Sequence, residues 1–459
     1  MTALPGERSA RVVSYGGDDV RCGLIAPATT DELADALARA SGAGRRITFR
    51  SGGCAFDTQS LNRDLIVSLD RLRGLTFSAD ATSVEVGAGE PWGEVVRAAH
   101  RRGCIPPVVV TTERASAAGT TSGNCVSRWS PRHGPDSAHV HGVELVTVRG
   151  RRMRLAPGDD AFFGVTGGLG YLGAIARVDL ALVPNPHDQV ETRVVAAGAV
   201  GEILAACAPA GLPAGNDVTA YGVLLPDLRR GMAYQSRYVS GQRLRRFTAV
   251  HQPRSVLRML GELLLPSHAG SRLIGEIAYR FRGTRYVDPL LDYTFFMDGD
   301  VWFRRLGRRL GFEMRVVQQS FVVPVAAGAE LVERARRAFH DAAIAPTLVD
   351  VLYCPADRAL LSATHGQGGF VVSFAFSPRT RGRLARIRDA LVRLSKECRG
   401  LGGRVRLTKN VHADVDDLAA MYEATLPQFY ALKRRLDPDG LIRNAFLERV
   451  FPSLVPPPV

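Results

Sequence analysis

The sequence predicts an α+β protein with two or three folding units. A chain of 459 residues is too long to fold around one hydrophobic core. Segments with the two-residue period of a strand alternate with segments of helical period along the chain. Apolar residues make up 46% of the chain and charged residues 23%, an ordinary globular composition that argues against extensive disorder.

The first 186 residues read as alternating helices and strands. Residues 31–41 (DELADALARAS) carry leucines at helical spacing and end before a pair of glycines, which predicts a helix and its stop. PWGEVVRAAHRRG (91–103) predicts a second helix, with a proline in its first turn. HVHGVELVTVRGRRMRLA (139–156) predicts a hairpin that turns at Gly150. Three short apolar runs read as further strands: 46–49, 65–69 and 83–88.

Three glycine-rich stretches lie in this part of the chain, at 50–53, 119–123 and 164–173. A single cluster would indicate only a tight turn. None of them fits the P-loop pattern, and GGLGYLG (167–173) leads into a strand and not into a helix, which excludes a dinucleotide fingerprint. Three loops that can each lay backbone N–H groups against a pyrophosphate therefore indicate a large, extended cofactor.

The chain changes character from 187 to about 402, where helices and strands predict an α+β unit with an antiparallel sheet. Such a unit would cover the cofactor and form a substrate pocket at the junction of the two domains. Helical stretches are expected at 200–210, 329–343 and 381–402. Strands are expected at 318–325, 348–354 and 368–377.

Charge and cysteine usage exclude several classes of partner. The net charge is +14, but the basic residues are almost all arginines, and their scattered pairs lack the aromatic residues of a nucleic-acid groove. Seven widely spaced cysteines without a CxxC pair indicate neither a disulfide framework nor a metal site. No segment approaches the roughly 18 apolar residues of a membrane helix. We expect a cytoplasmic protein without an integral membrane segment, a metal or a nucleic-acid partner.

Three segments carry a resemblance to a known family. RSGGCAFDTQSLNRDLIVSLDRL (50–72) resembles the first pyrophosphate loop of the FAD-linked oxidases of the vanillyl-alcohol-oxidase superfamily, which share the PCMH-type flavin fold. VEVGAGEPWGEVVRAAHRRGCIPPV (84–108) and GGLGYLGAIARVDLAL (167–182) look like the next units of that fold. The last segment (402–451) looks closest to the branch of decaprenylphosphoryl-ribose, sugar-alcohol and aldonolactone oxidases.

The resemblance implies a PCMH-type two-subdomain FAD-binding domain plus an α+β cap (substrate) domain with an antiparallel sheet. The FAD-binding domain would span 1–186 and the cap 187–402, and the segment 403–459 would return to the FAD-binding domain. The implied cofactor is FAD.

The resemblance also implies which residues hold FAD. Many relatives carry a histidine at the position of Cys54 and bond it to the flavin, but a cysteine here is more often a packed thiol, so noncovalent FAD is expected. The segment NCVS (124–127) lacks the histidine–glycine pair of relatives, so Asn124 or Arg128 would contact the flavin instead. The expected cofactor residues are Arg50, Ser51, Gly52, Gly53, Cys54, Ala55, Gly119, Thr120, Ser122, Gly123, Asn124, Gly168, Gly170, Gly173, Ile175, Lys409 and Asn444.

Lys409 is the main catalytic candidate. It is expected on a strand, on the same side as Val405 and Leu407, so its ammonium would point toward packed residues. From the residues alone, an exposed lysine at a strand end is the favoured alternative. The family places a lysine beside the flavin ring or the substrate, where a positive charge stabilises developing negative charge. Asn410 and His412 would support it.

The resemblance implies an FAD-dependent oxidoreductase that transfers a hydride from a substrate C–OH to flavin N5. The substrate would be a small molecule such as a sugar, nucleoside or secondary metabolite, and the electron acceptor O2 or an unknown compound. Asp350 and Tyr353 are the other catalytic candidates, and Trp302, Gln319 and His412 are the substrate candidates.

Two alternatives remain open at this point. One is a flavin-dependent C=C reductase with a nicotinamide donor, and the other is a catalytically inactive flavin-binding scaffold. Lys409 argues against the scaffold, which would not need it. The ribose oxidases carry a tyrosine where this chain has Leu306, which argues against a lipid-phosphosugar substrate.

Overall fold

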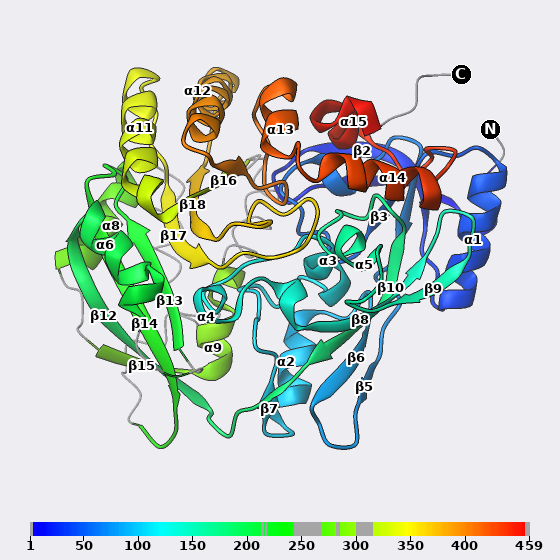
Figure 1. Ribbon diagram of the computed structural model, residues 1–459, viewed down its shortest axis with the longest axis horizontal. Coiled ribbons are helices and arrows are strands. Elements are labelled where there is room, and N and C mark those ends of the chain that lie inside the picture. Colours follow the sequence, from blue (N-terminus) through cyan, green and yellow to red (C-terminus); the bar gives the residue numbers. More distant parts are fainter. Residues whose placement is uncertain are drawn as a thin grey trace.

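Residues 3–212, 215, 218–242, 268–280, 285–299 and 315–454 are described by the computed structural model of the protein (Figure 1). The chain builds two small sheets first and one large sheet next, and its C-terminal helices then return to the first sheet. This arrangement has the mixed helices and sheets of the α+β class that the sequence predicts.

The first sheet contains four strands: β1 (Arg8–Val13), β2 (Asp19–Ile25), β3 (Ile47–Arg50) and β4 (Leu65–Ser68). Their order is β1-β2-β4-β3, with an antiparallel β1–β2 hairpin and β4 parallel to both of its neighbours. Helix α1 (Thr30–Gly42) makes the crossover from β2 to β3, because parallel strands need one. Thr29 caps α1, and Leu33 and Leu37 bury its apolar face. The predicted helix at 31–41 is therefore confirmed.

The second sheet contains five antiparallel strands: β5 (Leu75–Phe77), β6 (Ser83–Gly87), β8 (Val140–Val146), β9 (Arg152–Leu155) and β10 (Ala174–Ala181). Their order is β5-β6-β10-β8-β9, and the predicted hairpin that turns at Gly150 is the β8–β9 pair. A two-stranded pair lies beside it: β7 (Cys104–Ile105) and β11 (Val183–Pro184).

Short helices connect these strands and carry the loops of the site. Pro91 is the residue before α2 (Trp92–His100), so the predicted second helix is confirmed with its start one residue later. The other connecting helices are α3 (Ala117–Ser122), α4 (Ser130–His133), α5 (Phe162–Val165), η1 (Thr58–Ser60) and η2 (Asp136–His139).

The third sheet contains eight strands in the order β15-β12-β14-β13-β17-β18-β16-β19, all antiparallel to their neighbours. This is the antiparallel sheet expected for the cap. The strands are β12 (Gln189–Ala199), β13 (Val218–Leu224), β14 (Arg230–Val239), β15 (Arg285–Pro289), β16 (Val317–Val323), β17 (Leu348–Cys354), β18 (Gly369–Phe376) and β19 (Arg404–Val405).

The two faces of the large sheet have different partners. One face packs on three helices, α6 (Val200–Cys207), α11 (Gly328–Asp341) and α12 (Arg381–Gly400). Val351 and Phe374 join the main core on this face, whereas Leu352 and Val371 belong to a separate cluster with Val126 on the other face. Neighbours along a strand point to opposite faces, so only every second residue can reach the first half of the chain. The other helices of this part are α8 (His268–Arg280), α9 (Leu290–Thr294), η3 (Pro209–Gly211), η5 (Phe296–Gly299) and η6 (Val325–Ala327).

The C-terminal helices return to the first sheet, near the N-terminus (Figure 1). Ile442 forms a parallel bridge with Ile47 of β3. Lys433 is buried, and its Nζ binds Asp437 at 2.5 Å and the Tyr171 carbonyl oxygen at 3.0 Å. These helices are α13 (Val415–Met421), α14 (Leu426–Leu436), α15 (Ala445–Val450) and η7 (Pro452–Leu454).

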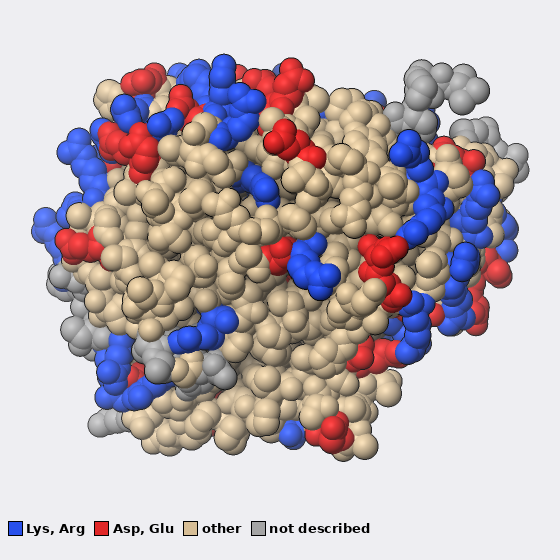
Figure 2. Space-filling model, viewed as in Figure 1, with Lys and Arg blue, Asp and Glu red and all other residues tan. Residues whose placement is uncertain are grey.

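Basic and acidic side chains lie next to one another along the top and right edges of the visible face, around a broad area with few charged residues (Figure 2). On α11, for example, Arg334 pairs with Glu330 of the same helix and with Glu397 of α12. Basic side chains on this face therefore have acidic neighbours.

Candidate active site

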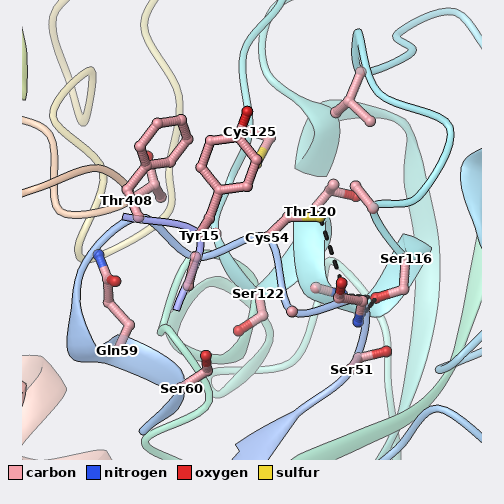
Figure 3. Close-up of a pocket in the computed structure, with 18 of the residues that line it drawn as sticks. Tyr15, Ser51, Cys54, Gln59, Ser60, Ser116, Thr120, Ser122, Cys125 and Thr408 are labelled. Atoms are coloured by element: carbon pink, nitrogen blue, oxygen red, sulfur yellow. Dashed lines mark hydrogen bonds between the residues drawn. The ribbon is translucent and has the colours of Figure 1, made fainter. Parts of the chain in front are cut away.

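A pocket lies where loops from the two small sheets meet the turn that follows β19 (Figure 3). Its wall contains eleven of the residues expected to hold FAD or act in catalysis. They are Arg50, Ser51, Gly52, Gly53, Cys54, Ala55, Gly119, Thr120, Ser122, Gly123 and Lys409.

The first loop follows β3 and turns sharply at two glycines. Gly53 has φ +68°, a conformation that residues with a β-carbon rarely adopt, and a Cβ there would overlap Nη2 of Arg50. A Cβ at Gly52 would lie 2.6 Å from the carbonyl oxygen of Arg114. Both glycines are therefore required by the local fold of the protein itself. The amide of Gly53 donates to no described residue and is available to a ligand.

Arg50 supplies a positive charge to this wall. Its Nη1 donates to Ser60 Oγ at 3.1 Å and its Nη2 to the Val13 carbonyl oxygen at 2.9 Å. None of the described carboxylates lies within 4.0 Å of it. Burial lowers the pKa of Arg50. A guanidinium fixed by neutral acceptors keeps its charge for an anionic ligand, which suits the diphosphate of FAD.

The second loop is held by hydrogen bonds behind the pocket. Ser116 Oγ accepts from the Gly119 amide and from the Gly52 amide, at 3.3 and 3.4 Å, and so joins the first two loops. Trp92 Nε1 donates to Thr120 Oγ1 at 3.0 Å. Across the pocket, Thr408 Oγ1 is buried without a hydrogen-bond partner among the described residues. A buried hydroxyl without a partner in a cofactor pocket fits a polar ligand that binds it there.

The third glycine stretch does not form the wall, which corrects four of the expected cofactor residues. A Cβ at Gly168 would overlap the Gly164 carbonyl oxygen, and Gly173 has φ +149° with Val146 O only 2.8 Å from its absent Cβ. Gly170 turns the chain at φ +79°, and Ile175 is a core residue of β10. Gly173 and Ile175 pack in the second sheet, Gly168 packs on Gly164, and Gly170 lies behind Phe49 and Ser122. From this stretch only Leu169 lines the pocket.

The two asparagines are also placed away from the pocket wall. Asn124 has φ +44°, and its side chain donates to Ser362 Oγ at 3.1 Å and accepts from Ser137 Oγ at 2.5 Å. Asn444 caps α15 and donates to the Gln59 carbonyl oxygen at 2.8 Å. Their amide groups are used within the protein, so both support the loops from behind and neither is placed to contact FAD directly.

Lys409 lies in a turn, since β19 ends at Val405, and the expected strand is therefore too long. Its Nζ lies 3.8 Å from the centre of the Phe56 ring, and no described carboxylate is within 4.0 Å. Burial lowers the pKa of Lys409 to about 8, against the opposing effect of Asp350. Asn410 Oδ1 accepts a hydrogen bond from the backbone N–H of Gln318 at 2.9 Å and so holds this turn against β16.

Asp350 and Tyr353 lie three residues apart on β17 and therefore point to opposite faces of the sheet. Asp350 does not line the pocket, but it lies on the face of the sheet that carries Leu352 and Val126. Burial raises the pKa of its carboxyl, and the charge of Lys409 lowers it. Gln318 Nε2 lies 3.4 Å from Asp350 Oδ1. Tyr353 packs against Phe370 on the side of the helices, so its placement in the catalytic site is wrong.

The same alternation corrects Gln319. Its side chain points toward α12, where Nε2 donates to Ser395 Oγ at 2.9 Å and Oε1 accepts from the His412 amide at 2.7 Å. Its neighbour Gln318 points toward Asp350 instead. His412 is also outside the pocket wall, and burial lowers its pKa to about 4. Trp302 and Leu306 lie outside the described residues.

Several wall residues were not among the site residues predicted from the sequence. Gln59 donates to the carbonyl oxygens of Leu407 and Lys409, at 2.9 and 2.8 Å, and so ties the first loop to the lysine turn. Phe56, Gln59 and Ser60 lie in the segment 50–72 that resembles a pyrophosphate loop, and that resemblance was the signal that could have found them. Further wall residues are Tyr15, Cys125, Val126, Met297, Arg406 and Thr408.

None of the seven cysteines, all of which lie in the described residues, forms a disulfide bond, and two of them, Cys54 and Cys125, line the pocket. Burial raises the pKa of Cys125 to about 11, so its thiol is protonated at neutral pH. The Cys54 thiol donates to the Gly52 carbonyl oxygen, with Sγ and O 3.4 Å apart.

In the described part of the chain, no group of three or more His, Cys, Asp or Glu residues is arranged to hold a metal ion. None of the helices in the described ranges is both long and apolar enough to cross a membrane.

Two family models match the chain. One, described as an FAD binding domain, matches residues 23–156, and the other, described as D-arabinono-1,4-lactone oxidase, matches residues 310–450. The first contains the two loops that form the pocket, and the second contains Asp350 and Lys409.

Individual relatives also match over part of the chain. Cytokinin dehydrogenase 4 of Arabidopsis thaliana is 32% identical over 189 residues, which are 40% of this chain and 34% of the relative. Alditol oxidase of a Streptomyces species is 33% identical over 171 residues, 34% of this chain and 38% of the relative. The chain thus spans about a third of the length of the curated relatives it matches. Together with the glycine loops, the Arg50 wall and the Thr408 hydroxyl, these matches show that the chain belongs to the FAD-linked oxidases of the vanillyl-alcohol-oxidase superfamily.

Proposed function

We propose that the protein is an FAD-dependent oxidoreductase that oxidises a C–OH group of a small polar molecule. The observation that carries this proposal is Lys409, a half-buried cation with no described carboxylate within 4.0 Å, which lines the pocket and lies in the segment that matches the lactone oxidase model. The alditol oxidase relative acts on an alditol by its name, which supports a C–OH substrate.

We also propose that the three sheets belong to two different domains. The four- and five-stranded sheets would be the two subdomains of an FAD-binding domain spanning 1–186. The eight-stranded sheet would be the cap, and because β19 belongs to it, we place the end of the cap after Val405 and not at 402. The helices that follow would complete the FAD-binding domain, since Ile442 bridges to β3.

The residues of the wall fit the parts of FAD. Arg50 and the Gly53 amide would bind the diphosphate, and Thr408 Oγ1 and Lys409 would face polar atoms of the flavin or the substrate. FAD, when bound, accepts the hydride from the substrate carbon and passes its two electrons to an acceptor, either O2 or another compound.

Two side chains of the protein would serve the substrate. The Asp350 carboxylate accepts the proton of the substrate hydroxyl, because burial has already raised the pKa of this carboxyl toward the range of a base. The Lys409 ammonium stabilises the negative charge that develops as that proton leaves. The carbon loses a hydride and the oxygen a proton, so the product is a carbonyl compound.

The purified protein should be yellow, with a flavin absorption spectrum. Acid precipitation should release the flavin into the supernatant, because we propose that no covalent bond holds it. A yellow pellet would contradict the noncovalent part. A colourless protein that FAD cannot reconstitute would overturn the proposed function, and bleaching by NADPH with no response to any alcohol would favour the C=C reductase.

The rate of flavin bleaching should depend on the charge of Lys409. Its pKa of about 8 means that the ammonium form dominates below pH 8 and disappears above it. The anaerobic bleaching rate should therefore be highest below pH 8 and fall about tenfold per pH unit above it. Stopped-flow measurements from pH 6 to 10 test this. Lys409→Arg should be slower but lose the fall above pH 8, since arginine stays charged. A flat wild-type profile would contradict the role of the charge.

A further inference from the structure

Arg128 is a buried arginine surrounded by aromatic rings. It is 6% exposed, and its Cζ lies 4.6, 4.4 and 4.1 Å from the ring centres of Tyr221, Tyr293 and Phe296. We call these four residues the arginine cage. Tyr221 belongs to β13 of the large sheet, while Tyr293 and Phe296 belong to α9 and η5. The cage therefore combines the loop after α3 with two parts of the cap.

The guanidinium has five N–H donors and few acceptors. Among the described residues, it donates one hydrogen bond, from Nη1 to the Tyr293 carbonyl oxygen at 3.4 Å, and none of their carboxylates lies within 4.0 Å of it. Neither Nε nor Nη2 is a fully buried nitrogen that lacks a hydrogen-bond partner. These two donors therefore border accessible space. Aromatic faces attract the cation but do not accept all of its N–H groups.

Arg45 is a buried arginine with a structural role, and its surroundings differ from those of Arg128. Arg45 is 5% exposed, and its guanidinium pairs with both Glu7 and Asp64, at 3.0 and 2.5 Å. The charge of Arg45 is thus balanced within the fold, as the cost of a buried charge requires. Arg128 is equally buried without such a partner.

None of the four cage residues lines the pocket, but neighbours of two of them in the sequence do. Val126 and Met297 line the pocket wall, and they are close in sequence to Arg128 and Phe296. Tyr221 packs against the cluster that contains Val126 and Leu352, on the face of the sheet that carries Asp350. The Ala220 amide donates to the Arg128 carbonyl oxygen at 3.0 Å and fixes the cage against β13. A substrate whose C–OH group lies near Lys409 and Asp350 could extend along this wall.

We propose that Arg128 binds an anionic oxygen group of the substrate, a carboxylate or a phosphate ester, so that the enzyme acts on a hydroxy acid or a sugar phosphate and not on a neutral polyol. This rests on the proposed function. The planar fork of a guanidinium matches two oxygens of such a group, and the surrounding rings exclude water, which strengthens the contact. The arrangement places charge recognition where the loop after α3 meets the cap, and oxidation beside Lys409.

Binding of matched probe pairs to the holoenzyme tests the proposal. Xylitol is compared with xylonate, and ribitol with ribitol 5-phosphate, which separates the two sources of the charge. Affinity is read from the flavin difference spectrum and from tryptophan fluorescence, because Trp129 lies beside the cage, with its ring centre 5.8 Å from that of Tyr293. The charged member of at least one pair should bind roughly 10- to 100-fold more tightly.

Variants locate that preference. Arg128→Met should abolish it while FAD stays bound, and Arg128→Lys should keep part of it, because lysine retains the charge without the fork. Arg154→Met is the matched control, since this side chain on β9 is 81% exposed and its loss lowers the net charge equally. If Arg128→Met fails to fold, the affinities of the charged and neutral probes for the wild type and for Arg128→Lys test the proposal instead.

Equal affinity for charged and neutral probes in the wild type, or an unchanged preference in a folded Arg128→Met, overturns the proposal. The proposed function fails on different grounds: the protein then binds no FAD, or no substrate bleaches it. The fluorescence signal of Trp129 does not need the flavin, so a preference for anions would still be seen in that case.

Discussion

Replacing Lys409 by methionine should slow the anaerobic bleaching of bound flavin by the true substrate roughly 100-fold or more. The ammonium lines the pocket with no described carboxylate within 4.0 Å, so its charge is not consumed by an ion pair. Methionine keeps an unbranched side chain of similar length and removes the charge. The measurement is single-turnover stopped-flow reduction of the holoenzyme, because steady-state turnover would also report reoxidation and product release.

The controls separate chemistry from folding. Lys396→Met removes an exposed lysine of α12 and should leave the rate unchanged. Burial disfavours the charged form of Lys409, as its lowered pKa shows, so Lys409→Met should melt at the same or a higher temperature than the wild type. Lys409→Arg should recover little at neutral pH, because a planar fork does not replace a compact ammonium in a packed wall. An unchanged reduction rate in Lys409→Met with FAD bound would remove the residue from catalysis.

Gly53→Val should abolish the retention of FAD. The new side chain would have to adopt φ +68°, and its Cβ would displace the guanidinium of Arg50 from the pocket wall. The change would thus cost both the left-handed backbone conformation and the contacts that hold the positive charge in place, each contact to a charged group contributing about 1.5–3 kcal/mol. Flavin content after gel filtration is the measurement.

Gly44 provides the matched control for this variant. It has φ +64°, but a Cβ there would meet no atom within 4 Å. Gly44→Val should therefore lower the stability through backbone strain alone, while the protein keeps its flavin. Wild-type flavin content in Gly53→Val would show that this loop is not part of the cofactor site.

Local structure was predictable from the sequence where a single element decides it. The helices at 31–41 and 91–103 and the hairpin at 139–156 follow from hydrophobic spacing and from turn residues, and all three are present. The glycines of 50–53 could be assigned to the pocket, because a sharp turn after an apolar strand is a local feature.

It was harder to predict which face of the large sheet each side chain occupies. Asp350 and Tyr353 cannot share a face, and Gln318 and Gln319 cannot either, but which member of each pair points to the pocket depends on which face the helices cover. That choice is set by packing between α6, α11, α12 and the sheet. The third glycine stretch misled for a similar reason, since its glycines permit close packing against Val146 and Gly164 and not against a ligand.

The return of the C-terminus to β3 bears on the order in which the protein is made. Asn444 binds the Gln59 carbonyl oxygen, Gln59 holds the Lys409 turn, and Ile442 bridges to Ile47. The loop that receives the diphosphate leaves the ribosome early, but the segments that brace it are among the last to be synthesised. A nascent chain that has reached only the end of the large sheet therefore still lacks the braces of its cofactor loop, so tight loading of FAD should follow release of the complete chain from the ribosome.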